Sequence, residues 1–426
     1  MNVCIAGMGK IGVPLAVQFG LKGADVVGYD ISAERCYVIN NKRNPLPGEP
    51  GLDEKIPGLV VSDRLRATTD AADAATAADV IVFIVPVDID ATQQPDFTHL
   101  DAAVEAIGPH VQRGALVIVE TTVPVGTTRH RVARRIGELA QLTPGDDFAA
   151  AFSPERVSSG TVLLDLQRYP KIVGGIDETS TERAAAFYTQ VLDAEVLRMP
   201  GAETAEYSKL LETTYRDVNI ALANEFARLG DAMGVDTRAA IAAANTQPYS
   251  HIHAPGPGVG GHCIPVYPYF LTATQLPAAS LVETELANAA RRINDGMAHY
   301  GIDRLAAGIG SLEGLTVAVV GLSYRAGVKE HRHSSTFGLA RALIAHGASP
   351  YVYDPLYSAR EISALGLEPA PSWPMVCDAV IVQAWQPDAK MDLAGMDGLR
   401  AVLDARSALD RNVIEGAGIT YLAIGA

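Results

Sequence analysis

The sequence lacks the features that mark membrane, secreted and zinc-binding proteins. No run of about 18 apolar residues passes without interruption, so no membrane-spanning helix is predicted. The amino terminus has no basic segment leading into an apolar one, so we expect no signal peptide. The four cysteines are scattered and form no CxxC pair, so neither a disulfide framework nor a zinc site follows. These absences favour a reducing, cytoplasmic setting and a protein without metal.

Positive charge is also scarce. The chain has 34 Lys and Arg residues against 49 Asp and Glu residues, which gives a net charge of −15. Non-specific binding of nucleic acid requires a basic surface, so we expect no nucleic-acid partner. Local basic residues can still bind an anionic substrate. The 426 residues exceed what one hydrophobic core usually supports, so two or three domains are predicted.

The first thirty residues carry a dinucleotide-binding pattern. A predicted strand at 2–6 runs into Gly7, Gly9 and Gly12 with the spacing GxGxxG, and a helix and a second strand then lead to Asp30. The glycines allow a tight turn and let a pyrophosphate approach backbone N–H groups at the start of the helix. A carboxylate at the position of Asp30 can bind the adenosine ribose and disfavours a 2′-phosphate. The pattern therefore predicts NAD rather than NADP as cofactor.

Further apolar runs at 79–85 and 115–120 indicate buried parallel strands. In open α/β sheets ligands bind beyond the carboxyl ends of the strands, so Thr121 and Thr122 are candidates for the floor of an active site. Capping of a helix is the alternative role for these threonines. Glu155 follows another apolar stretch and is either a general base or a turn cap.

One long helix is predicted over 201–234, where Gly and Pro are few and Ala, Leu and Glu are frequent. It would span roughly 45 Å or more at 1.5 Å per residue. Such a helix suits a link between two α/β domains and a dimer surface. Lys209 on this helix could polarise a substrate oxygen, and an ordinary exposed lysine is the alternative.

A second α/β unit begins near 315, with predicted strands at 316–320, 379–383 and 401–404. It repeats the plan of the first domain without the GxGxxG run, which suggests binding of another nucleotide. The predicted fold class is α/β, with two Rossmann-like doubly wound domains joined by a long central helix. The predicted domains are 1–196, 197–300 and 301–426. Four basic residues near the strand ends of the second domain would suit a diphosphate or are solvated loop charges: Arg325, Lys329, Arg332 and Arg406.

One cysteine stands in a segment of unusual composition, PGPGVGGHCIP at 255–265. Four glycines in the six positions 256–261 leave little side-chain bulk before Cys263 and permit close approach of a ligand. A thiol presented in this way can act as a nucleophile. Together with a hydride acceptor it would oxidise an aldehyde through a thioester to an acid. The alternative is a surface loop with a buried thiol.

Six blocks of the sequence together resemble the nucleotide-sugar 6-dehydrogenases, of the UDP-glucose and UDP-N-acetylmannosamine dehydrogenase type. The resemblance spans essentially the whole chain, and the last part of the fourth block and the fifth block look most like the N-acetylhexosamine branch. The blocks are GMGKIGVPLA at 7–16, ETTVPVGTT at 120–128, SPERV at 153–157, EYSKLLETTYRDVNIALANE at 206–225, PGPGVGGHCIP at 255–265 and GLSYR at 321–325.

The resemblance implies NAD-dependent oxidation of the C6 hydroxyl of a UDP-sugar or dTDP-sugar to the uronate, in a homodimer formed through the central helix. Cys263 would form the thiohemiacetal and thioester. Lys209 would stabilise charge on oxygen, Glu155 would assist proton transfer or hydrolysis, and Thr122 would help to place the water.

The motif and the resemblance together predict two sets of contacts. The cofactor contacts are Gly7, Gly9, Lys10, Ile11, Gly12, Asp30, Arg35, Val85, Pro86, Thr121, Thr122 and Arg332. The substrate contacts are Glu155, Arg156, Val157, Lys209, Thr213, Asn219, Gly258, Gly260, Gly261, Cys263, Tyr324 and Arg325.

The chain departs from the family pattern close to the two main catalytic positions. Tyr267 stands four residues after Cys263, where the family has Asp, and Thr213 stands four residues after Lys209, where it has Asn. A tyrosine with a pKa of about 10 is a poor base near neutrality. Three functions therefore remain open. They are four-electron oxidation to a uronate, oxidation that releases the aldehyde or uses an unusual sugar of a specialised glycoside, and binding of a nucleotide sugar without catalysis.

Overall fold

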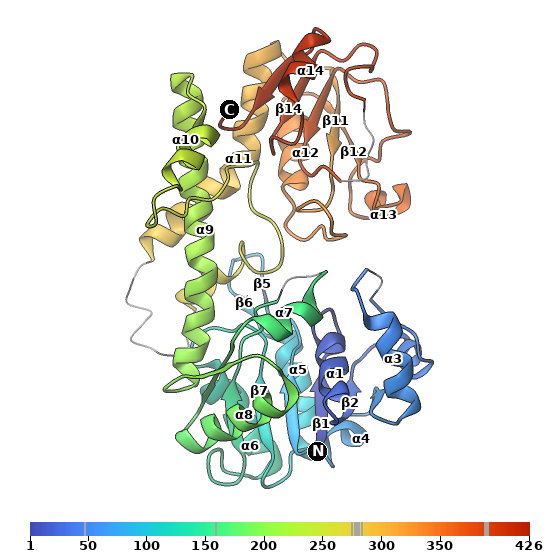
Figure 1. Ribbon diagram of the computed structural model, residues 1–426, viewed down its shortest axis with the longest axis vertical. Coiled ribbons are helices and arrows are strands. Elements are labelled where there is room, and N and C mark those ends of the chain that lie inside the picture. The colour runs from blue at the N-terminus through green and yellow to red at the C-terminus, as the bar shows by residue number, and fades with distance from the viewer. Residues whose placement is uncertain (47, 158–159, 274–275, 277–281, 283, 387–391) are drawn as a thin grey trace. The chain divides into compact units, whose positions relative to one another are not determined.

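The computed structural model describes the chain except residues 47, 158–159, 274–275, 277–281, 283 and 387–391 (Figure 1). Two compact units are present. The first comprises Met1–Glu212 and Tyr269–Glu283, and the second comprises Thr213–Pro268 and Thr284–Ala426.

The first unit contains an eight-stranded sheet with the strand order β10-β9-β8-β7-β4-β1-β2-β3. Neighbouring strands pair in parallel except β8 and β9. The strand order reverses between β1 and β4, and this switch point opens the crevice in which doubly wound sheets bind ligands. The strands are β1 (Asn2–Ala6), β2 (Asp25–Tyr29), β3 (Leu65–Thr68), β4 (Val80–Phe83), β7 (Leu116–Val119), β8 (Ala149–Phe152), β9 (Lys171–Gly175) and β10 (Val196–Arg198), with a separate antiparallel pair of β5 (Asp88–Ile89) and β6 (Pro95–Asp96).

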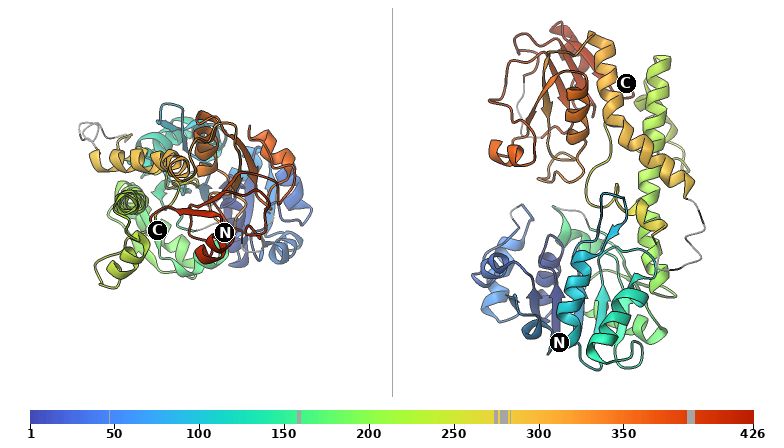
Figure 2. Two further views of the ribbon diagram at one scale, coloured as in Figure 1. Left: turned by 90° about the horizontal axis from the view of Figure 1, so that it is seen from above. Right: turned by 180° about the vertical axis from the view of Figure 1, so that it is seen from behind.

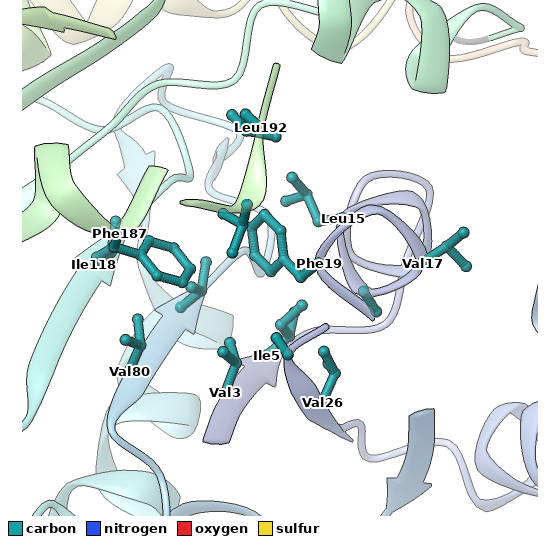
Figure 3. Packing of buried hydrophobic residues seen from close by; sticks show 14 of the residues in the cluster. Val3, Ile5, Leu15, Val17, Phe19, Val26, Val80, Ile118, Phe187 and Leu192 are labelled. Atoms are coloured by element: carbon teal, nitrogen blue, oxygen red, sulfur yellow. The ribbon is translucent and has the colours of Figure 1, made fainter. Parts of the chain in front are cut away.

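Alternate residues of the central strands form one apolar face of this sheet, and α1 and α8 cover that face. Figure 3 shows Phe19 of α1 meeting Phe187 of α8 near Ile5 and Ile118 of the sheet. The two rings pack edge to face with centroids 5.3 Å apart. Burial of one such ring stabilises the fold by about 1.5–3 kcal/mol. The helices of this unit are α1 (Gly12–Leu21), α2 (Ala33–Asn40), α3 (Leu52–Val61), α4 (Ala71–Ala75), α5 (Thr98–Ile107), α6 (Arg134–Ala140), α7 (Val162–Arg168) and α8 (Glu178–Val191).

The second unit contains a parallel five-stranded sheet with the order β12-β11-β13-β14-β15. Alternation along β11 covers both faces, because Val317 and Val319 join a core with α11 and α12, whereas Ala318 and Val320 join one with α14. Its elements are β11 (Thr316–Val320), β12 (Ser349–Tyr353), β13 (Ala379–Val382), β14 (Ala401–Asp404), β15 (Thr420–Ala423), α10 (Thr237–Ala244), α11 (Glu285–Ile309), α12 (Ser335–Ala345), α13 (Ala359–Ala364) and α14 (Arg411–Gly416).

One helix, α9 (Ala202–Met233), contributes residues to both units. Its 32 residues form a single uninterrupted helix in Figure 2. At 1.5 Å per residue the helix is about 48 Å long. The predicted fold class, with two Rossmann-like α/β parts and a long central helix, is confirmed. No helix of the described residues is both long and apolar enough to cross a membrane.

Candidate active site

The turn after β1 forms a cradle for a pyrophosphate. Gly7 has a φ of +107°, a conformation that L side chains rarely adopt. A Cβ on Gly12 would lie 1.8 Å from the Gly7 carbonyl oxygen, so this contact requires glycine. At Gly9, by contrast, no described atom lies within 4 Å of the Cβ position. The turn that also contains Lys10 and Ile11 is therefore open beside the N-terminus of α1, where backbone N–H groups favour an anion.

Asp30 lies at the end of β2, beside this cradle. Its Oδ2 accepts hydrogen bonds from the Met8 N–H at 2.9 Å and from Arg35 Nη1 at 2.8 Å, and its Oδ1 accepts one from the Ser32 N–H at 2.9 Å. The carboxylate is thus fixed where it can meet the ribose of a dinucleotide. The cradle and this carboxylate fit NAD, and Arg35 is held by Asp30.

The segments that follow β4 and β7 meet beside the switch point. The Thr121 hydroxyl donates a hydrogen bond to the Val85 carbonyl at 2.5 Å, and Val85 lies directly before Pro86. Thr121 and Thr122 are buried, with 7% and 5% of their surface exposed. The next helical turn begins only at Thr128, so neither threonine caps a helix. Their capping alternative is therefore wrong.

A chain of buried polar groups lies beneath Glu155. Lys171, the first residue of β9, places Nζ 3.0 Å from Glu155 Oε2 and 3.1 Å from Glu120 Oε2. The Tyr188 hydroxyl donates a short hydrogen bond to Glu120 Oε1. The other oxygen of Glu155, Oε1, accepts the Arg156 N–H at 2.7 Å. Burial raises the pKa of Glu120 to about 7, although Lys171 opposes this shift.

The first turns of α9 contact the loop after β7 and the loop after β8. Glu206 accepts the N–H groups of Gly126 at 2.6 Å and Thr128 at 2.8 Å, which ties α9 to the loop that follows Thr122. One turn later, Lys209 is 8% exposed. The alternative assignment of Lys209, an ordinary exposed helix lysine, is therefore wrong.

Glu212 connects Lys209 to the loop that carries Glu155. Its Oε1 lies 3.8 Å from Lys209 Nζ, and its Oε2 accepts a hydrogen bond from Arg156 Nε at 2.9 Å. Within the first unit, the structure therefore places the predicted residues Lys209, Arg156 and Glu155 in one neighbourhood.

The second unit carries Cys263 at the end of the glycine-rich segment. All four cysteines lie among the described residues, and Cys263 is half-buried while the others are buried. Pro255 and Pro257 are buried, so the segment is packed and not a surface loop. Both parts of the alternative assignment, a surface loop and a buried thiol, are wrong. The Cys263 carbonyl accepts the Tyr267 N–H at 2.9 Å and so starts a tight turn.

Packing within the second unit accounts for the glycines of this segment. A Cβ on Gly258 would lie 2.8 Å from Ser335 Oγ, and a Cβ on Gly260 would lie 2.5 Å from the Tyr324 Cβ. Gly261 has a φ of +94° and donates its N–H to the Arg332 carbonyl at 2.8 Å. The glycines thus let the segment lie directly on the loop that follows β11.

Other side chains hold the same segment in place. Asn224 of α9 accepts the Gly256 N–H at 2.9 Å, and His262 Nε2 lies 2.9 Å from Glu330 Oε2. Asn219, a predicted substrate contact, uses its amide to hold the backbone of His251 at 2.7 Å and of His253 at 2.9 Å.

The basic residues of the second unit differ in their surroundings. Arg406 donates from Nε to the Gln383 carbonyl at 2.9 Å, and burial lowers the pKa of its guanidinium to about 10. Lys329 is exposed and pairs with Glu361 at 2.6 Å. Arg325 is also exposed, with its guanidinium 5.8 Å from the centre of the Tyr324 ring. Among the described residues, no group of three or more His, Cys, Asp or Glu could hold a metal ion.

Comparisons with known proteins agree with this arrangement. Three models of the UDP-glucose/GDP-mannose dehydrogenase family match in order: the NAD binding domain at 1–192, the central domain at 203–296 and the UDP binding domain at 318–411. The chain belongs to the UDP-glucose/GDP-mannose dehydrogenase family. The predicted resemblance, the NAD cofactor and the activity of a nucleotide-sugar dehydrogenase are thereby confirmed.

Relatives within this dehydrogenase family cover nearly the whole chain. The UDP-N-acetyl-D-mannosamine dehydrogenase of Pyrococcus horikoshii is 36% identical over 83% of this chain and 84% of that protein. The NDP-N-acetyl-D-galactosaminuronic acid dehydrogenase of Ralstonia solanacearum is 33% identical over 95% of each chain. The solved structure of the Pyrococcus horikoshii enzyme has a TM-score of 0.88 at 31% identity, over 100% of this chain and 99% of that one. A UDP-glucose dehydrogenase from Pyrobaculum islandicum has a TM-score of 0.85 at 28% identity, over 100% and 97%.

Several residues that support the predicted site of this dehydrogenase do not stand out in its sequence. Lys171 is the most informative of them. It opens an otherwise apolar strand, KIVGG, and a charged residue in a buried strand needs a partner. That signal was available, but the identity of the partners was not, because Glu120 lies 51 residues away in the sequence.

Proposed function

We propose that this dehydrogenase oxidises the C6 hydroxyl of a UDP-N-acetylhexosamine to the uronate, with UDP-glucose as the second candidate. The main support for this type of reaction is the half-buried thiol of Cys263. A dehydrogenase that stopped at the aldehyde would not need a nucleophile. The relatives named for N-acetylated sugars, at 36% and 33% identity, support the choice of sugar.

Cys263 splits the second oxidation into easier steps. Its sulfur adds to the aldehyde carbon, the thiol proton passes to the aldehyde oxygen, and a thiohemiacetal forms. Loss of a hydride and the hydroxyl proton gives a thioester. Water then adds, one of its protons goes to Glu155 and the other to the departing sulfur, and the carboxylate is released. Bound NAD supplies the hydride acceptor, once for each oxidation, and the turn at Gly7 and Gly9 together with Asp30 would hold it.

The first unit supplies the charges for these steps. Lys209 is a buried cation that would stabilise negative charge on the sugar O6, the kind of fixed electrostatic contribution that usually dominates catalysis. Glu155, held at both carboxylate oxygens, would take a proton from the attacking water. Because Tyr267 replaces the family's aspartate, we assign this proton transfer to Glu155. Thr122 would help to place the water.

The second unit would bind the UDP part of the substrate. Arg325 and Tyr324 of the loop after β11, together with Arg406 after β14, are the groups that we propose for the diphosphate. The match to a UDP binding domain at 318–411 supports this assignment. The three functional segments of the chain would then be the predicted 1–196, 197–300 and 301–426.

The deciding experiment counts NADH formed per sugar consumed, over UDP-N-acetylmannosamine, UDP-N-acetylglucosamine, UDP-galactose, UDP-glucose and dTDP-glucose. We expect two NADH per sugar and the highest kcat/KM on an N-acetylated substrate. One NADH per sugar would establish the aldehyde-releasing alternative suggested by Tyr267 and Thr213. Cys263→Ala should abolish formation of the acid, whereas Cys377→Ala, which alters a buried thiol in the core of the second sheet, should not. Uronate formation by Cys263→Ala would contradict the covalent mechanism.

We also propose that two copies associate through α9. Five large apolar side chains spaced by seven, four, three and four residues lie exposed along this helix: Tyr215 59%, Leu222 41%, Phe226 39%, Leu229 57% and Met233 60%. This spacing forms one stripe, as in helices that pair along a seam. An exposed apolar stripe of this length favours a protein partner over water, and a second copy offers the matching stripe.

A further inference from the structure

Lys171 is a charged group in a place where charge is costly. It is 4% exposed, and its two carboxylate partners, Glu120 and Glu155, have side chains that are 0% and 11% exposed. Taking ions out of water is unfavourable unless good geometry and further hydrogen bonds compensate for the lost hydration. An apolar residue would therefore stabilise the same strand end at least as well. The presence of a lysine here calls for another reason.

The two carboxylates that Lys171 joins are not equivalent. Glu120 is fully buried and accepts a hydrogen bond from the Tyr188 hydroxyl. Burial raises the pKa of Glu120 to about 7. Glu155 is the member of this hydrogen-bonded series that lies nearest to solvent, and its Oε1 accepts a hydrogen bond from the Arg156 N–H. The lysine therefore sits between a carboxyl that can hold a proton near neutrality and a carboxylate presented at the end of the sheet.

The Lys171 side chain is 5% exposed, and its Nζ lies within hydrogen-bond distance of both Glu120 and Glu155. Its cation is thus directed at these two carboxyl groups. Its effect on the reaction is transmitted through Glu155, the more exposed of the two partners.

We propose that Lys171 is a positioning residue for Glu155, whose carboxylate it holds in the orientation that accepts a proton from the attacking water, with Glu120 and Tyr188 as its buried support. This inference rests on the proposed function of Glu155. The ionisable groups around the pair come from the end of one strand, from three helices and from the loop before α7. They are Glu120 directly after β7, Asp165 of α7, Tyr188 of α8, Lys209 and Glu212 of α9, and Arg156 of the loop, which Glu212 binds.

The test compares Lys171→Met, Lys171→Arg and the wild type by rapid mixing with the substrate that yields two NADH. Loss of the cation should leave NADH formation in the first turnover intact and slow thioester hydrolysis, so that kcat falls by about 100-fold, the lower range of a general-base contribution. KM should change little. Lys171→Arg should restore most of kcat.

Arg131→Met is the matched control, because it removes an ion pair with Asp101 in the same unit, away from Glu155. It should lower Tm without a change in kcat. A folded Lys171→Met variant with the wild-type kcat would overturn the proposal, and so would a kcat loss that Lys171→Arg fails to reverse.

Glu120→Gln keeps the proposal testable if Lys171→Met does not fold. The amide is a weaker acceptor for Lys171 Nζ than the carboxyl group, so Lys171 should orient Glu155 less well and kcat should fall with KM unchanged. A wild-type kcat would refute the proposal. Glu155→Gln separates this inference from the function beneath it. Full hydrolysis by Glu155→Gln would refute the assigned base itself, whatever Lys171→Met does.

Discussion

The imidazole of His262 lies against the carboxylate of Glu330, with Nε2 2.9 Å from Oε2. This contact joins the residue before Cys263 to the loop after β11. Glu330 also accepts the Arg332 N–H through Oε1 at 3.0 Å and is 7% exposed. The segment that presents the thiol is therefore fixed by the second sheet and not only by its own turn.

Glu330→Gln should loosen this connection. The amide cannot accept both hydrogen bonds as a carboxylate does, so we expect a loss of about 1–3 kcal/mol in the free energy of unfolding of the second unit. Urea denaturation and the rate of iodoacetamide labelling at Cys263 measure the effect, and labelling should become faster. Glu361→Gln breaks the exposed pair with Lys329 and should change neither value. Equal behaviour of the two variants would contradict the connection.

Gly260→Ala should damage the same segment by steric overlap. Its new methyl group would lie 2.5 Å from the Tyr324 Cβ and 2.9 Å from the His333 carbonyl oxygen. Overpacking of this kind usually costs about 1–3 kcal/mol, and oxidation should slow because Cys263 is displaced. Gly296→Ala is the control, since no described atom lies within 4 Å of its Cβ position inside α11, and it should raise Tm slightly. Thermal melts and steady-state rates compare the two.

Glu206 should make stability depend on pH. Burial raises its pKa in the folded protein to about 7, above the value of about 4.3 expected when unfolded. Its contribution is therefore fully present below about pH 4.3 and is lost as the pH rises towards 7, because the unfolded chain releases the proton first. The stability advantage of the wild type over Glu206→Gln should shrink across this window.

Glu203, one turn earlier on α9, provides the opposite control. Burial would raise its pKa, but the hydrogen bond and charge of Arg129 together with a backbone hydrogen bond prevail and lower it. Its contribution is present above the unfolded pKa of about 4.3 and is lost as the pH falls below that value. Urea denaturation from about pH 2 to pH 8 should show opposite trends for Glu203→Gln and Glu206→Gln. Parallel trends would show that burial does not control the pKa of Glu206.

Asp30→Ser should weaken the preference for NAD. The substitution removes the carboxylate that repels a 2′-phosphate and releases Arg35, which can then bind that phosphate. We expect the ratio of kcat/KM for NAD to that for NADP to fall roughly tenfold to a hundredfold, or about 1.4–2.7 kcal/mol. Asp25→Ser alters the first residue of β2 and breaks a surface ion pair with Arg64. This variant should leave the ratio unchanged. An unchanged ratio in Asp30→Ser would remove Asp30 from cofactor selection.

Charge on the α9 stripe should separate the proposed dimer. Phe226→Glu and Leu229→Glu each place a carboxylate among apolar side chains that would be buried between two copies. Light scattering after gel filtration should give twice the chain mass for the wild type and the chain mass for these variants. Ile344→Glu, which alters an exposed apolar residue of α12, should leave the wild-type mass. A wild type with the mass of one chain would refute association through α9.

Local elements of this protein followed closely from the sequence. The helix predicted over 201–234 is α9 (Ala202–Met233), and the strand predicted over 79–85 is β4 (Val80–Phe83). The prediction overran at the end of β4 because the apolar run continues to Val85, whereas Pro86, which has no N–H to donate, turns the chain.

The sequence alone determined the parts whose chemistry is local. Three glycines at fixed spacing set the dinucleotide turn, continuous apolar runs indicated the buried strands, and six ordered blocks indicated the family. Only the tertiary structure decided what supports Glu155, because Lys171 follows it by 16 residues while Glu120 precedes Lys171 by 51. Parallel strands joined by helices bring distant residues to one sheet edge, and a burial pattern along the chain does not record which of them will meet. The charges of this cluster acquire their partners, and Glu120 its raised pKa, only when β7, β9 and α8 pack together.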